Sequence, residues 1–146
     1  MINVQTFIKN NDEFIEISKV VSDSIHEEYI DGAIYLTINH QNIMSFELWD
    51  TIDDLWGYIC NGLEEVSNGK EFECFFPDQP VKIKFFPVGF DRVLVQVGDK
   101  KGVSIDKIEF LSEMKKGAIF FFENLKRISP TNKELANDII SQVDSL

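Results

Sequence analysis

The chain has 146 residues, of which 44% are hydrophobic and 12% aromatic, including thirteen Phe. This composition excludes a disordered chain and predicts one globular domain over residues 1–146, because burial of so much apolar surface can offset the entropy of ordering. The 25 Asp and Glu outnumber the 14 Lys and Arg, which gives a formal net charge of −11. Such a charge repels a phosphate backbone, so it argues against nucleic acid as a partner and favours a basic protein.

The ends and the apolar runs predict a cytoplasmic protein without membrane contact. The opening "MINVQTFIKNNDEF" lacks the basic cluster and apolar run of a secretory signal. The longest apolar stretch, "GAIFFFENL", is interrupted by Glu123 and Asn124. It is therefore shorter than the roughly 20 apolar residues that a membrane-spanning helix needs.

The first half of the chain contains strand patterns. "EFIEISKVV" (13–21) fits either an alternating strand or an amphipathic helix, and we favour the strand. "AIYLTI" (33–38) alternates clearly, and the turn residues "NHQN" (39–42) lead into "IMSFEL" (43–48). This succession predicts a β-hairpin.

The segment "SFELWDTIDDLWGYICNGLEE" (45–65) predicts an amphipathic helix. Asp50 or Thr51 is the expected N-cap, and Gly69 is expected to end the helix in a left-handed conformation. The predicted buried face consists of Leu48, Ile52, Leu55, Trp56, Ile59, Leu63 and Val66. The opposite face consists of Glu47, Asp50, Asp54, Tyr58, Asn61 and Glu65, with Asp53 and Glu64 beside it.

This opposite face is acidic throughout, and residues 45–66 contain no Lys or Arg. Acids three and four residues apart repel each other by a few tenths of a kcal/mol, and a solvated helix face usually mixes both signs of charge. We therefore predict that these eight residues form a partner-binding surface, with Tyr58 as its aromatic anchor. The alternative hypothesis is that the stripe is only a solvated face and that the acidity serves solubility.

The second half of the chain predicts a three-stranded antiparallel meander followed by two helices. The strands are "EFECFF" (71–76), "VKIKFF" (81–86) and "RVLVQV" (92–97), with Val81, Ile83 and Phe85 facing inward and Lys82 and Lys84 outward. Asp106 and Glu109 have capping-box spacing at the start of a helix over 104–128. After Ser129 and Pro130, Thr131 and Glu134 are expected to cap a helix carrying Leu135, Ile139, Val143 and Leu146. The predicted fold class is α+β, a mostly antiparallel sheet with two or three helices packed on one face.

Motifs of known enzyme and metal chemistry do not appear. His26 begins "HEEYI", where Ile30 takes the place of the second zinc-binding His, and Cys60 and Cys74 lack C-x-x-C spacing and fit buried apolar positions. The turn "VGDKKG" is no phosphate loop, and there is no G-x-S-x-G. We expect a protein that is not an enzyme and has no catalytic residues, metal or cofactor. A small enzyme using His26 or His40 is the least favoured alternative.

Three stretches, "DGAIYLTINHQNIMSFELWDTIDDLW", "FPDQPVKIKF" and "FLSEMKKGAIFFFENL", resemble small uncharacterised bacterial proteins of the immunity-protein type of polymorphic toxin systems. The resemblance covers most of residues 31–126 and rests on general pattern. It implies a compact cytoplasmic protein that binds a toxin domain and blocks its active site or the access to it. Such toxins are often basic nucleases, whose nucleic acid an acidic surface would imitate. The alternative is a general interaction or adaptor module, or a homodimer formed through Ile119 and Phe120.

Overall fold

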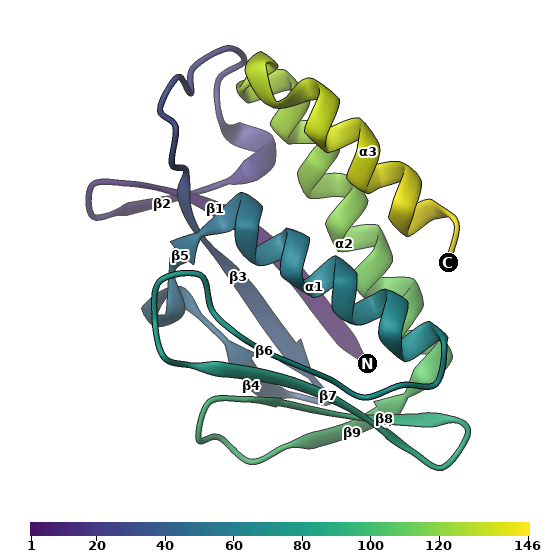
Figure 1. The fold of residues 1–146 in the computed structure, drawn as a ribbon. Coiled ribbons are helices and arrows are strands. Elements are labelled where there is room, and N and C mark those ends of the chain that lie inside the picture. Colours follow the sequence, from purple (N-terminus) through teal and green to yellow (C-terminus); the bar gives the residue numbers. More distant parts are fainter.

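A computed structural model describes residues 1–146, and its strands form two separate antiparallel sheets (Figure 1). The first sheet contains β1 (Ile2–Asn10), β2 (Glu13–Glu16), β3 (Asp31–Ile38) and β4 (Gln41–Met44) in the order β2-β1-β3-β4, and the short β5 (Asp50–Thr51) pairs with β3. The second sheet contains β6 (Phe72–Phe75), β7 (Lys82–Val88), β8 (Arg92–Val97) and β9 (Val103–Asp106) in chain order.

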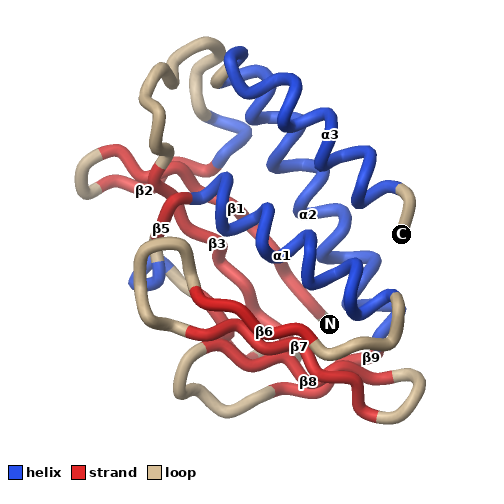
Figure 2. Tube along the Cα trace, viewed as in Figure 1, coloured by secondary structure: helices blue, strands red, loops and turns tan.

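Three α-helices form a layer on one side of these sheets, as Figure 2 shows. They are α1 (Ile52–Ser67), α2 (Lys107–Ile128) and α3 (Lys133–Asp144). Short 3₁₀ turns occupy η1 (Ile17–Lys19), η2 (Phe46–Leu48) and η3 (Pro130–Asn132). The predicted α+β class, with antiparallel strands and helices on one face, is confirmed. None of the helices is both long and apolar enough to cross a membrane.

A continuous core of 34 buried residues lies between the helices and both sheets. Its largest side chains are aromatic, and Trp56 of α1 stacks near Phe121 of α2 with ring centroids 6.4 Å apart. The indole Nε1 of Trp56 donates a hydrogen bond of 3.0 Å to the Thr6 hydroxyl of β1. Because α1 also contacts β3, β6 and β7, this helix joins the two sheets.

The predicted hairpin and meander are both confirmed. β3 pairs with β4 around a turn in which Asn39 and His40 have φ of 50° and 67°. In β7 the side chains of Ile83 and Phe85 are buried, whereas Lys82 and Lys84 lie on the other, partly exposed face. Strand β9, which the sequence did not predict, pairs antiparallel with β8 and completes the second sheet.

The first thirty residues contribute more strand than the sequence predicted. The favoured strand within 13–21 is confirmed only for the four residues of β2, and the chain then turns into η1. The long strand β1, which we did not predict, pairs with β2 and β3. It points Ile2, Thr6 and Ile8 toward the core, so a period of two was present in the sequence.

Two predictions at helix starts are wrong. α1 begins at Ile52 with Thr51 as its N-cap, which is one of the two predicted N-caps, but Glu47 and Leu48 lie in η2 and Asp50 lies in β5 instead of on the helix. The cause is tertiary, because the Ile52 amide donates to the Ile30 carbonyl at 2.8 Å and β5 pairs with β3. The N-cap of α3 is Asn132, not Thr131, because Pro130 opens a 3₁₀ turn there.

Candidate functional site: the acidic end of helix α1

The buried face of α1 matches the predicted one from Ile52 onward. Ile52, Leu55, Trp56, Ile59, Leu63 and Val66 are all buried, and Cys60 and Gly62 are buried with them. The Gly62 position has no room for a side chain, since a Cβ there would lie 2.6 Å from the Phe72 ring. The predicted N-cap of α2 is also confirmed, because the Asp106 carboxylate accepts from the Glu109 amide at 2.9 Å. The Glu109 carboxylate, however, pairs with the N-terminal amine of Met1 at 3.3 Å, and no return bond to the Asp106 amide forms.

Six of the eight predicted partner-binding residues lie on α1. Asp54, Tyr58, Asn61 and Glu64 are exposed, and Asp53 and Glu65 are half-buried. The second half of this face lies beside α3, where the Gln142 side-chain amide donates to Asn61 Oδ1 at 3.1 Å and to Glu64 Oε2 at 3.3 Å. The freely accessible part of the predicted surface is therefore its N-terminal half, around Asp54 and Tyr58.

Asp50 does not belong to the accessible surface, because its side chain is only 3% exposed. Its carboxylate accepts hydrogen bonds from the Thr51 amide at 2.7 Å and from the Asp78 amide at 3.1 Å. The Gln79 side-chain amide donates a further hydrogen bond of 3.1 Å to it. Through these hydrogen bonds, Asp50 holds the turn between β6 and β7 against the start of α1. The expectation that Asp50 lies on an exposed helix face is therefore wrong.

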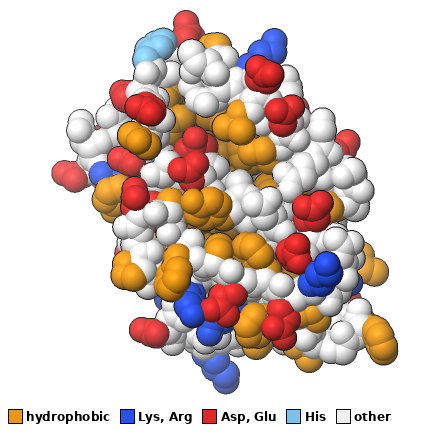
Figure 3. All heavy atoms as spheres, viewed as in Figure 1, with side chains coloured by type: hydrophobic (Ala, Val, Ile, Leu, Met, Phe, Trp, Pro, Cys, Tyr) orange, Lys and Arg blue, Asp and Glu red, His pale blue; other side chains and the backbone are white.

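The turn that Asp50 holds brings further acids to the same place. We call this surface the acidic end, which consists of Asp31, Glu47, Asp53, Asp54 and Asp78 around the start of α1. Asp31, Glu47 and Asp78 line a shallow hollow of about 290 Å³ there, together with Trp49 and Gln79. Figure 3 shows acidic side chains gathered over this end of α1, with few Lys or Arg among them.

The carboxyl groups of the acidic end interact with one another. Burial raises the pKa of Asp54, and the nearby carboxylates of Asp78 and Asp50 raise it further. Burial also raises the pKa of Asp53, to which the charge of Asp54 adds. Asp53 Oδ1 is buried without a hydrogen-bond partner. An added positive charge would therefore stabilise the carboxylates of Asp53 and Asp54.

The protein itself supplies very little of that charge. Of its five salt bridges, only the Lys100–Glu47 pair at 3.9 Å involves the acidic end. The neighbouring Lys9 lies with its Nζ 4.4 Å from the centroid of the Trp49 ring, in a cation–π contact. The Trp49 side chain is nevertheless 42% exposed, and that of Tyr58 is 39% exposed.

Sequence reasoning did not identify Asp31, Trp49, Asp78 or Gln79 as parts of this surface. Trp49 carried a signal, since a large aromatic between acids in "ELWD" suits an interface. The other three residues come from a strand end and a turn that are distant in sequence. Only the β3–β5 pairing and the hydrogen bonds of Asp50 bring them to α1.

The histidines and cysteines lie elsewhere. His26 and His40 are exposed, and neither lines the hollow at the acidic end. Burial raises the pKa of the Cys60 thiol to about 12, and it also raises the pKa of Cys74. No three His, Cys, Asp or Glu side chains converge so as to hold a metal ion.

Comparison of the chain with protein families, with curated proteins and with solved structures finds no match.

Proposed function

We propose that the protein is a binding protein without enzymatic activity that captures a basic protein through the acidic end of α1. The observation that carries this proposal is the concentration of carboxylates without cations at that end. Four of its five acids, Asp31, Asp53, Asp54 and Asp78, have no salt-bridge partner. The repulsion of Asp54 by Asp78 and of Asp53 by Asp54 costs folding energy, which a basic partner would recover on binding.

The exposed aromatics beside the acids support the same proposal. Tyr58 follows Asp54 by one helical turn, and Trp49 lies in the hollow with Asp31 and Asp78. Aromatic side chains supply large rigid contact areas, while surrounding charges steer the encounter. A surface with both features is suited to fast and specific capture of a positively charged protein.

The resemblance to immunity proteins supplies the class of partner. In this proposal the protein acts in the cytoplasm as the inhibitor of a cognate toxin domain, such as a basic nuclease. It would cover the toxin's active site or the access to it. The acidic end would then occupy the place of the phosphate groups that a nuclease binds.

Co-expression tests this function directly. A toxic reading frame encoded beside this gene is expressed alone, with the wild-type protein, and with the Asp54→Lys/Asp78→Lys variant. We expect growth rescue by the wild type and loss of rescue by the double variant. Asp91→Lys/Asp138→Lys, an equal charge change at an exposed turn between β7 and β8 and at an exposed position of α3, is the matched control and should still rescue growth.

Folding of each variant is checked by thermal melting, so that loss of rescue cannot come from loss of the protein. Rescue by the double variant as strong as that by the wild type would contradict the proposed surface. Failure of the wild type to rescue, with no stable complex on co-purification, would contradict the proposed function.

A further inference from the structure

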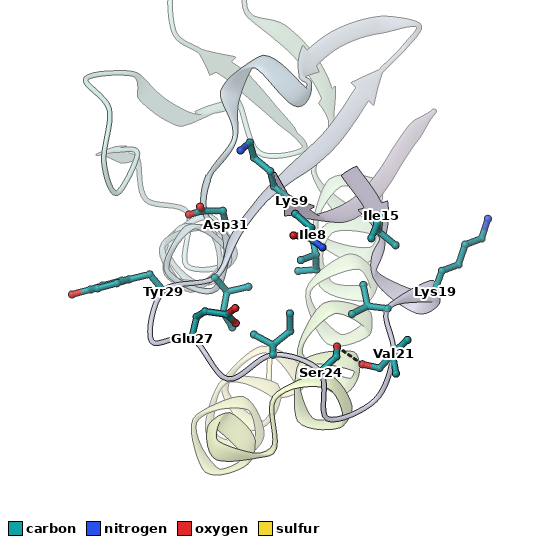
Figure 4. Close-up of a pocket in the computed structure, with 13 residues that line it drawn as sticks. Ile8, Lys9, Ile15, Lys19, Val21, Ser24, Glu27, Tyr29 and Asp31 are labelled. Carbon is teal, nitrogen blue, oxygen red and sulfur yellow. Dashed lines mark hydrogen bonds between the residues drawn. The ribbon is translucent and has the colours of Figure 1, made fainter. Parts of the chain in front are cut away.

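A second hollow lies between the first sheet and the loop that connects η1 to β3 (Figure 4). It encloses about 370 Å³, near the lower limit of small-ligand sites. We call it the 20–30 pocket. Its apolar lining consists mainly of Ile8, Ile15, Val20, Val21, Ile25 and Ile30. Such a lining accepts an aliphatic chain of a few carbons.

The loop that walls this pocket is held in place by the end of α2. The Arg127 guanidinium donates to the carbonyls of Ile17 and Val20. The amides of Asp23 and Ile25 donate to carbonyls in the last turn of α2 at 2.9 and 3.0 Å. Because these bonds fix the loop before any ligand arrives, a ligand need not contribute the cost of ordering it.

The charges at the mouth of the pocket are mainly negative. Glu27 and Asp31 line it, and neither carboxylate is in a salt bridge. Lys9 and Lys19 line it too, but Figure 4 shows both lysine chains directed away from the hollow. The Asp31 carboxylate is also directed outward, so Glu27 is the acid that faces the hollow. The Lys9 Nζ is engaged over the Trp49 ring. Over residues 9–31 there are seven acids and two lysines, so the local field favours a cation.

We propose that the 20–30 pocket binds the side chain of a lysine that the basic partner presents. The four methylene groups of the lysine lie against the isoleucines and valines, and the ammonium group meets Glu27 at the mouth, where Asp31 adds to the negative field. The pocket adjoins the acidic end, since Asp31 lines both hollows. This inference rests on the proposed function, because the basic protein is the source of the lysine.

Titration of the ¹⁵N-labelled protein with N-acetyl-lysine N-methylamide tests the pocket without any partner. We expect saturable shifts of the Ser24, Ile25 and Glu27 amides, with a Kd on the order of 1 mM. The norleucine counterpart has the same aliphatic chain without the ammonium group. It should bind about five-fold more weakly, because it makes no ion pair.

Two variants test whether Glu27 supplies the negative charge that binds the ammonium group. Glu27→Gln should weaken lysine binding about three-fold, as loss of one partly exposed ion pair does. Glu28→Gln removes the same charge from an exposed neighbour outside the lining and should leave the Kd unchanged. Both side chains are exposed, so both variants should fold.

Three results would overturn the inference: equal binding of the norleucine compound, an equal effect of Glu28→Gln, or no saturable shift at these amides. Binding of free pentylamine but not of the lysine derivative would also overturn it, in favour of a small-amine site. None of these results affects the co-expression test. A failure of the pocket and a failure of the proposed function are therefore distinguishable.

Discussion

At the scale of single residues, Asp50 has a structural role, in contrast to the exposed acids that we propose for binding. Its carboxylate is buried and accepts from three residues, so its removal would leave several donors unsatisfied. We predict that Asp50→Ala lowers the free energy of unfolding by about 3 kcal/mol. Urea denaturation measures this difference. Glu47→Ala, at an exposed acid of the same region, should stay within about 0.5 kcal/mol of the wild type. An equally small effect at Asp50 would contradict the structural role.

Asp54 is the residue at which the cost of holding a carboxylate in the acidic end can be measured, a cost that comes first from its partial desolvation and then from the charges of Asp78 and Asp50. Its pKa in the folded protein is raised above the ordinary value, so folding favours the protonated form. The resulting penalty is absent below the unfolded pKa of about 4 and sets in as pH rises through the folded value. Asp54→Asn removes the penalty, and we predict a higher melting temperature at pH 7.

The gain from Asp54→Asn should shrink on acidification to pH 4, because the wild-type carboxyl then takes up its proton. Thermal melts of the two proteins at both pH values provide the measurement. Asp138→Asn, at an exposed position of α3, serves as control. A gain of the same size at pH 4 and pH 7 would show that the carboxylate charge is not the cause.

At the scale of elements, the apolar period predicted the body of α1 but not its start. Leu48 and Ile52 fit one helical face, and a helical wheel cannot show that the chain between them is in a strand. That information lies in β3, whose Asp31 and Gly32 pair with Thr51 and Asp50. Tertiary pairing therefore overrode a local pattern: it took Glu47 and Asp50 off the helix and buried Asp50, while Glu47 stayed exposed at the acidic end.

The elements with a complete local signal were predicted correctly. α2 has the predicted N-cap at Asp106, which its hydrogen bond confirms, and the meander has alternation and turns in the sequence itself. The predicted cap of α3 failed although Thr131 and Glu134 have suitable spacing. The neighbouring Pro130 started a 3₁₀ turn, and no side-chain cap forms at Asn132. A spacing pattern predicts a cap only where the backbone before it can take the cap conformation.

Trp56 tests the role of α1 as the element that joins the two sheets. Its side chain is fully buried and bonded to Thr6 of β1. Trp56→Ala should lower the free energy of unfolding by roughly 3–5 kcal/mol through lost burial and the cavity left behind. Trp56→Phe leaves the Thr6 hydroxyl without its hydrogen-bond donor. Because it keeps most of the apolar volume, it should nevertheless cost clearly less stability than Trp56→Ala. Chemical denaturation compares the two. Near wild-type stability of Trp56→Ala would contradict the assigned packing.

At the scale of the whole molecule, acidity alone does not locate a binding surface, because a net charge of −11 also suits solubility. The fold adds the location. Other acids, such as Glu73, Glu113 and Glu123, are paired with lysines, whereas the acids at the start of α1 are brought together largely without cations. The sequence predicted part of that surface through α1. The rest of the surface comes from the start of β3 and from the turn between β6 and β7, which only the folded structure brings next to α1.

Binding kinetics at two ionic strengths distinguish the residues of this surface that speed association through their charge from those that slow dissociation through direct contact. With the partner captured by co-expression, Asp54→Lys/Asp78→Lys should slow association most at low salt, because steering by exposed charges is screened by ions. Tyr58→Ala should leave association nearly unchanged and raise the dissociation rate about thirty-fold, equivalent to about 2 kcal/mol. Asp91→Lys/Asp138→Lys controls for net charge. A homodimer through Phe120, which is 50% exposed, would instead persist at high salt and respond to Phe120→Ala but not to the α1 variants.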